Sequence, residues 1–225
     1  LDSGGFGSWH ATYAMNWVSQ INFYHRYLNN RVIYVTGSTG VGKSTQAPKL
    51  FLYSLKMLDY KNGSVICTQP RIQPTEKNAQ SIAGQLGVPI INNKVSQKTI
   101  CKQEQDDEKK APEDMMFNHY VQYQHGRSKH ARNTVAHPVL KFVTDKKLLT
   151  FLTSNILVKE MQKNKDKESE PDTLHNSNRN MYDIVIVDES HEHNVNMDLI
   201  LTLMKYSAYY NNSIKLVIVS ATMDD

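Results

Sequence analysis

Cysteine is scarce in this chain of 225 residues, since Cys67 and Cys101 are its only two. Two thiols are too few for a disulfide framework or a cysteine-rich zinc site, which indicates a reducing, intracellular setting such as the cytoplasm or nucleus. The chain also lacks an apolar run of about 18 residues, so no membrane span is predicted. Its first residues, LDSGGFGSWH, do not resemble a signal peptide and include no initiating Met. We therefore expect a fragment or a processed piece of a longer protein.

Charge of one sign is in only slight excess. The formal net charge is +4, with 40% hydrophobic and 21% charged residues, which is ordinary for a globular protein. A mildly basic chain can have a polyanionic partner, although this balance alone does not establish one. The length suffices for one α/β domain with insertions or arms.

Strand and helix patterns alternate from residue 31 to the end. Short β-branched runs predict strands at 31–36, 64–69, 139–144, 182–190 and 214–222. Helical periodicity lies between them, at 45–58, 75–86, 145–161 and 196–210. This alternation predicts an α/β domain over 31–225, with a parallel sheet and helices on both faces.

Three segments fall outside that pattern. Residues 1–30 are predicted to form a flexible arm and then a helix over 11–29, whose aromatic stripe packs on the domain or stacks on RNA. Residues 97–118 and 161–180 are polar and lack apolar periodicity, so we interpret them as surface insertions. Solvated loops are the simpler interpretation, and a partner or RNA contact from 159–167 is the alternative.

The segment GSTGVGKS, at 37–44, matches the phosphate-loop pattern GxxxxGK[ST] between a predicted strand and a predicted helix. Its glycines let backbone N–H groups point at phosphate oxygens, and the helix N-terminus adds its positive dipole end. Lys43 can reach the β- and γ-phosphates, and the Ser44 hydroxyl can bind Mg²⁺. The candidate nucleotide-binding residues are Gly37, Ser38, Thr39, Gly40, Val41, Gly42, Lys43, Ser44 and Thr45.

Two carboxylates, Asp188 and Glu189, follow the apolar run IVIV. The carboxyl ends of parallel strands share one sheet edge, so we expect them beside the phosphate loop. Asp188 is the candidate metal residue, and Glu189 is the candidate base that orients or deprotonates the attacking water. The two motifs together predict hydrolysis of a magnesium–nucleotide.

Five segments in order resemble the first RecA-like domain of superfamily 2 DExH/DEAH-box helicases. They are GSTGVGKSTQAP, CTQPR, TDKKLL, VDESHEHNVNMDLILTLMK and KLVIVSATMD. The resemblance implies a phosphate-loop NTPase that uses Mg²⁺ and ATP, or another NTP, to translocate along and unwind nucleic acid, with RNA favoured over DNA. It places His191 at the γ-phosphate, Ser220 and Thr222 in coupling, and Pro70, Arg71, Thr144 and Asp145 along the nucleic-acid track.

The chain departs from the family pattern at several positions. The box is DESH rather than DEAH, and His193 stands where Arg is usual. Ile72 replaces the second Arg of TQPRR, and Lys146-Lys147 replace Gly-Met in TDGMLL. These departures and the insertions favour a divergent, viral member, similar to the poxvirus nucleoside triphosphatase-helicase.

The chain ends shortly after SAT, so the second RecA-like domain that this family uses to complete the ATP site is absent from it. Because an arginine finger contributes about 10³–10⁵ in rate in related phosphate-loop enzymes, we expect weak nucleotide binding and very little hydrolysis. Two alternatives stay open. One is the helicase part of a flaviviral-type protease-helicase, and the other is a catalytically idle nucleotide-binding scaffold.

Overall fold

The computed structural model describes residues 17–38, 40, 42–57, 63–86, 90–91, 121–126, 140–159, 179–190, 192 and 194–221. The predicted arm at 1–10, the insertion at 97–118 and nearly all of the insertion at 161–180 lie outside these ranges. Within them, no helix has the length and apolar character needed to cross a membrane.

In the described part of the chain, seven strands form one sheet. They are β1 (Val32–Thr36), β2 (Val65–Gln69), β3 (Ile90–Ile91), β4 (Val121–Gln124), β5 (Leu140–Thr144), β6 (Ile184–Val187) and β7 (Lys215–Ser220). Their order across the sheet is β1-β7-β6-β2-β5-β4-β3, and every neighbouring pair is parallel. The predicted parallel sheet is therefore confirmed.

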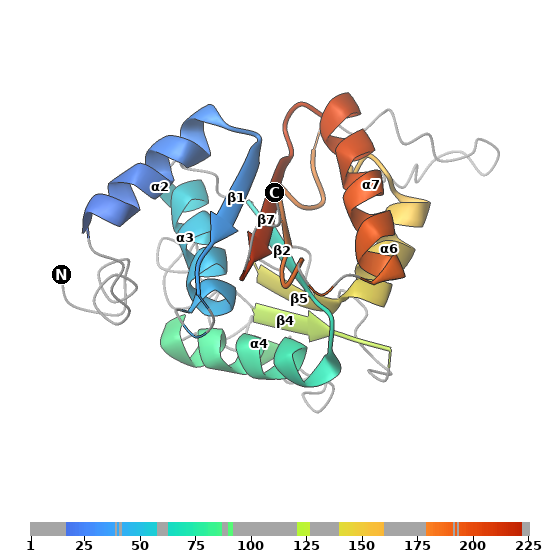
Figure 1. Ribbon diagram of the computed structural model, residues 1–225, viewed down its shortest axis with the longest axis horizontal. Helices are drawn as coiled ribbons and strands as arrows, with labels where there is room; N and C mark the ends of the chain where they lie inside the picture. The colour runs from blue at the N-terminus through green and yellow to red at the C-terminus, as the bar shows by residue number, and fades with distance from the viewer. Residues whose placement is uncertain are drawn as a thin grey trace, which may run out of the picture.

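Helices cover both faces of the sheet, as predicted (Figure 1). The helices α2 (Trp17–Asn29), α3 (Lys43–Met57) and α4 (Ile72–Leu86) lie on one face, and α6 (Asp145–Ser154) and α7 (Val195–Tyr210) on the other. Phe51 of α3 and Ile82 of α4 share a buried core with Phe142. Met204 of α7 shares a second core with Val185. The protein is a three-layer α/β domain.

The central strands are buried on both faces. All residues of β2 and β6 are buried, and neighbours along β2 alternate between the two cores, with Val65 and Cys67 in one and Ile66 in the other. Two-sided burial explains why these strands are nearly continuous apolar runs rather than alternating ones.

Two helices differ from the prediction by three residues or more at one end. α4 begins at Ile72 rather than 75, because Pro74 falls in its first turn, where a missing N–H is tolerated. α6 ends at Ser154 rather than near 161. There the Asn155 side chain donates to the Lys159 carbonyl at 2.7 Å and accepts from the Lys159 N–H at 3.2 Å, which holds a turn in place of further helix.

Two strands, β3 and β4, were not predicted. β4 has the sequence VQYQ, in which Val121 and Tyr123 pack in the core on the α4 side of the sheet. Gln122 and Gln124 therefore point to the α6 side. Four residues with glutamine at alternate positions give too weak an apolar signal for a buried strand.

The second predicted insertion leaves and rejoins the domain at one place. Lys159 and Asn180 form an isolated antiparallel bridge, so the ends of the intervening segment are adjacent. Asn180 also hydrogen-bonds Asn211 and Ser213. This polar cluster joins the ends of the segment to the loop before β7.

Candidate nucleotide-binding site

The phosphate loop connects β1 to α3. Gly40 and Gly42 have φ angles of +87° and +84°, in the left-handed region that favours glycine. The Gly42 carbonyl accepts hydrogen bonds from the Thr45 N–H at 3.1 Å and the Gln46 N–H at 2.7 Å, which closes the first turn of the helix. Thr39 and Val41 lie outside the described residues. Both described glycines at positions 40 and 42 therefore adopt a backbone conformation that favours their residue type.

The Lys43 side chain folds back over this loop. Its ammonium donates to the carbonyl oxygens of Gly37 at 2.6 Å and Ser38 at 2.8 Å. The positive charge therefore already lies at the mouth of the loop. A phosphate oxygen there would offer it a charged acceptor in place of neutral carbonyls.

The loop and the acidic strand end meet at one edge of the sheet, as expected. Thr36, at the end of β1, pairs with Ser220 of β7, and Val187 of β6 pairs with Ile218. The Ser44 side chain lies close enough to the carboxylate of Asp188 to lower its pKa. This contact joins the two motifs on which the predicted site depends.

Asp188 is the most enclosed carboxylate of the site, with 1% of its surface exposed. Its Oδ2 accepts from Gln69 Nε2 at 2.5 Å, and its Oδ1 accepts from the Glu189 N–H at 2.9 Å. Burial raises the pKa of Asp188, these donors and Ser44 lower it, and the charge of Glu189 raises it further, with a net upward shift. A buried carboxylate with a raised pKa gains from a nearby cation.

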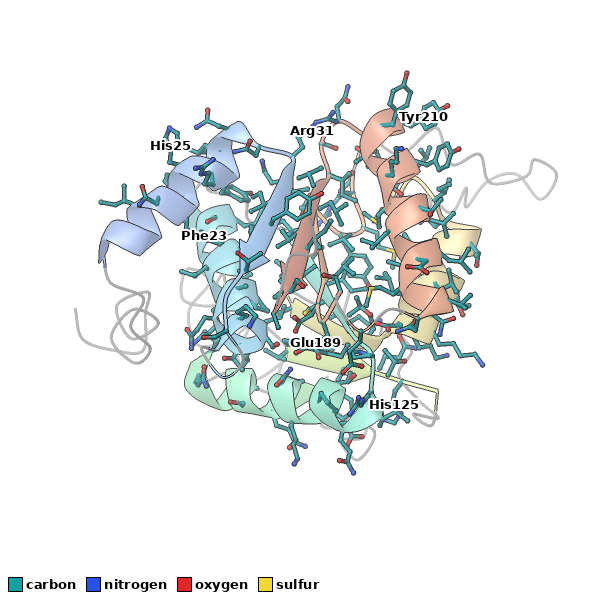
Figure 2. The ribbon with its side chains drawn as sticks, in the orientation of Figure 1. Phe23, His25, Arg31, His125, Glu189 and Tyr210 are labelled. Atoms are coloured by element: carbon teal, nitrogen blue, oxygen red, sulfur yellow. The ribbon has the colours of Figure 1, made fainter. Side chains whose placement is uncertain are left out.

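Glu189 is held in an unusual backbone conformation, with a φ of +56°. Left-handed geometry disfavours a residue with a side chain, so neighbouring contacts must hold it. Ser190 supplies them, because its N–H and its hydroxyl both donate to the Val219 carbonyl, at 3.0 and 3.1 Å. Glu189 consequently projects near the centre of the molecule, between the strands and α4 (Figure 2).

The chain has relatives among helicases. It is 52% identical over 233 residues to a putative ATP-dependent RNA helicase, R366, of Acanthamoeba polyphaga mimivirus, in an alignment that covers 96% of this chain. It is 26% identical over 197 residues to the DExH-box ATP-dependent RNA helicase DExH8 of Arabidopsis thaliana, and 25% identical over 197 residues to the human ATP-dependent RNA helicase DHX29. These alignments cover 88% and 87% of this chain. No protein-family model matches the chain.

The homologues of this chain are DExH-box helicases. The chain spans only 12% of the length of the mimivirus relative and 14% of the plant one. Residues 188–191 are its DExH box, with Ser190 at the variable position. His191, the last residue of the box, lies outside the described residues, as do His193 and the predicted coupling residue Thr222.

Beside the DExH box lie the residues expected along a nucleic-acid track. Arg71 is exposed and forms a 3.1 Å ion pair with Glu192. Thr144 is 7% exposed and Asp145 3%. The Asp145 carboxylate accepts from Thr68 Oγ1 at 2.5 Å; burial raises its pKa, and the Thr68 and Asn194 side chains lower it. Arg71 is thus exposed to a ligand, whereas Asp145 is buried and hydrogen-bonded to β2.

Sequence reasoning missed three residues that connect these groups: Gln69, Glu192 and Asn194. Gln69 and Arg71 are two positions apart, yet Gln69 contacts Asp188 and Arg71 contacts Glu192. Gln69 stands in the CTQPR segment, and the other two follow the DExH box, so their positions could have been suspected. Their partners lie 49 to 121 residues away and could not be inferred from the pattern.

A wide groove lies away from the DExH box, between β1 and α7. Its volume is about 930 Å³, and Tyr34, Lys205 and Tyr209 are among the residues that line it. It lies near Arg31 and Tyr210 in Figure 2. The candidate nucleotide site is defined by its converging polar groups and not by the size of a cavity.

Proposed function

We propose that this chain binds a magnesium–nucleoside triphosphate, ATP by preference, between the phosphate loop and the DExH box. The observation that carries the proposal is the sheet order, in which only β7 separates β1 from β6, so that the loop after β1 and the DExH box after β6 share one edge and Ser44 lies close enough to Asp188 to lower its pKa. The preference for ATP rests on the relatives, which are named as ATP-dependent helicases.

Each group has a distinct task in this proposal. The loop N–H groups and Lys43 hold the phosphates, and Lys43 exchanges its two carbonyl acceptors for phosphate oxygens. Glu189 orients the attacking water in line with the γ-phosphate, for which its enforced backbone conformation suits it. His191 contacts the γ-phosphate region, and Ser220 and Thr222 transmit the state of the site to other parts of the protein.

The residues present fit Mg²⁺. Hydroxyl and carboxylate oxygens, as in Ser44 and Asp188, are the hard ligands that this ion prefers, and it usually keeps several waters besides phosphate oxygens. Among the described residues, no group of three or more His, Cys, Asp or Glu side chains could hold a metal by itself. That composition suits an ion shared with a triphosphate. When bound, Mg²⁺ supplies positive charge that neutralises the phosphates.

We also propose that the nucleotide site acts on nucleic acid, with RNA favoured, as part of a helicase. Arg71 offers an exposed guanidinium for a backbone phosphate, and Pro70, Thr144 and Asp145 line or support the same edge. The end of β2 connects the proposed nucleotide site with the proposed nucleic-acid track, because Gln69 contacts Asp188 while Arg71 contacts Glu192. Unwinding belongs to the longer protein, in which a second RecA-like domain completes the site.

Nucleotide binding can be tested on this chain with a fluorescent ATP analogue and Mg²⁺. Lys43→Ala removes charge-assisted contacts worth about 1.5–3 kcal/mol, so affinity should fall about 10- to 100-fold. Lys77→Ala, which removes an exposed lysine on α4, is the matched control and should leave affinity unchanged. Equal affinity of the Lys43→Ala variant and the parent chain would contradict the proposal.

The helicase part needs the longer protein. Glu189→Gln should abolish ATP-driven unwinding of an RNA duplex while nucleotide binding persists. Unwinding or cellular function that is unchanged in this variant would instead identify an idle scaffold. A parallel DNA duplex distinguishes the two nucleic acids.

A further inference from the structure

A second polar pocket lies on the α6 side of the sheet, away from the phosphate loop. Its volume is about 190 Å³. Gln124 of β4, Lys141 of β5, Lys147 of α6 and Tyr182 supply its polar lining, and Phe151 is part of its apolar wall. In Figure 2, the labelled His125, which directly follows Gln124, marks the end of β4.

The lining is rich in hydrogen-bond donors and positive charge. Two ammonium groups, an amide and a phenol line the pocket, and none of the described lining residues is acidic. Beside it, Gln122 pairs in register with Lys141, so both side chains lie on the same face of the sheet. Gln122 Nε2 is buried and has no hydrogen-bond partner within the described part of the chain. The surroundings therefore suit an anion and not a cation.

The two lysines are close enough to affect each other. Lys141 is only 5% exposed. Burial, and then the positive charge of Lys147, lower the pKa of Lys141 to about 8. An anion between them would attract both ammonium groups and screen the repulsion between them.

We propose that this pocket binds a phosphate group through Lys141 and Lys147. A water molecule takes up about 30 Å³ in the liquid, so the volume accommodates one tetrahedral oxyanion with some water. The phosphate is either part of a nucleic-acid backbone or a free phosphate. A nucleic-acid backbone would extend the proposed nucleic-acid track, since Lys147 lies two residues after Asp145, and this source therefore rests on the proposed function. Binding of a free phosphate does not rest on the proposed function.

Lys147 distinguishes this site from the TDGMLL pattern of the family. Family members that carry TDGMLL have Met at this position, and TDKKLL places Lys there. Lys147→Met is therefore a substitution that the segment should tolerate. Lys146→Met is the matched control, because Lys146 is exposed, carries the same charge on the same helical turn and does not line the pocket.

Inorganic phosphate is the first probe, read by amide chemical shifts of the ¹⁵N-labelled chain. In the parent chain and in Lys146→Met, phosphate should shift the amides of Gln124, Lys147 and Tyr182 in a saturable way. In Lys147→Met these shifts should be lost, and the remaining amides should show that the fold persists. Shifts of the amides at 37–44 report binding at the phosphate loop separately. A failure of the proposed nucleotide site can therefore be distinguished from a failure of the proposed phosphate pocket. No saturable shift in the parent chain, or equal shifts in Lys147→Met, would overturn the proposal.

A single-stranded RNA oligonucleotide is the second probe, titrated at several salt concentrations. If the phosphate belongs to the backbone, Lys147→Met should weaken RNA binding and reduce the slope of log K against log salt by about 1, with a smaller change in Lys146→Met. If Lys147→Met loses inorganic phosphate but keeps full RNA affinity, the site serves a free phosphate.

Discussion

Gln69→Leu should destabilise the domain through a carboxylate 119 residues away. Gln69 is 1% exposed, and its amide donates to Asp188 Oδ2 at 2.5 Å. Leucine nearly preserves the side-chain volume but removes this donor, which leaves Asp188 with Ser44 and its own neighbouring N–H. A hydrogen bond to a charged group contributes about 1.5–3 kcal/mol. At about 2–4 °C per kcal/mol for a chain of this size, Tm should fall by about 3–12 °C.

The effect should depend on pH in a defined direction. Burial raises the pKa of Asp188 above its unfolded value, so its contribution to stability is fully present below the unfolded pKa and is lost as pH rises through the folded pKa. Without Gln69, which lowers this pKa, the folded value rises further. The difference in Tm between variant and parent should therefore be largest at neutral pH and shrink on acidification, as Asp188 becomes protonated in both.

Calorimetry in the absence of nucleotide, from pH 5 to pH 8, measures this difference. Gln73→Leu on the exposed side of α4 is the control and should change stability by less than about 0.5 kcal/mol. In an Asp188→Asn background, Gln69→Leu should be milder, with a coupling of at least about 0.5 kcal/mol. An equal fall in Tm in both backgrounds, at every pH, would refute the argument that Gln69 acts on the charge of Asp188.

Three other substitutions test separate parts of the structure. Asp188→Asn removes a buried carboxylate whose pKa is raised by burial, so melting scans at neutral pH without nucleotide should give a higher Tm. In this variant Mg²⁺ should no longer improve ATP affinity. The control Asp198→Asn, at an exposed carboxylate, should change neither Tm nor the effect of Mg²⁺. Asn211→Ala removes donors to the Leu157 carbonyl at 2.8 Å and Asn180 Oδ1 at 2.9 Å, and should cost about 2 kcal/mol in urea unfolding, so an unchanged midpoint would mean that this cluster is dispensable. Arg71→Ala breaks an ion pair with exposed partners and should change stability by less than about 1 kcal/mol, while RNA titrations should show weaker binding and a salt slope reduced by about 1.

The local motifs could be predicted because their requirements are local. A left-handed turn favours glycine at positions 40 and 42, and two-sided burial produces the apolar runs of β2 and β6. Because the carboxyl ends of parallel strands share one edge of the sheet, the proximity of the phosphate loop and Asp188 could be predicted from the sequence. The resemblance to DExH-box helicases rested on the same segments, and the relatives bear it out.

Only the tertiary structure decided which polar groups meet. The sheet order places β7 between β1 and β6, so Ser220 lies beside Thr36 although 184 positions separate them in the sequence. Folding also directs Gln69 to Asp188, buries Asp145 against Thr68 and brings Lys147 and Lys141 to one pocket. Periodicity records which face of an element is apolar, but a hydrogen bond or a charge contact depends on which elements become neighbours. That choice is made by the packing of the whole sheet.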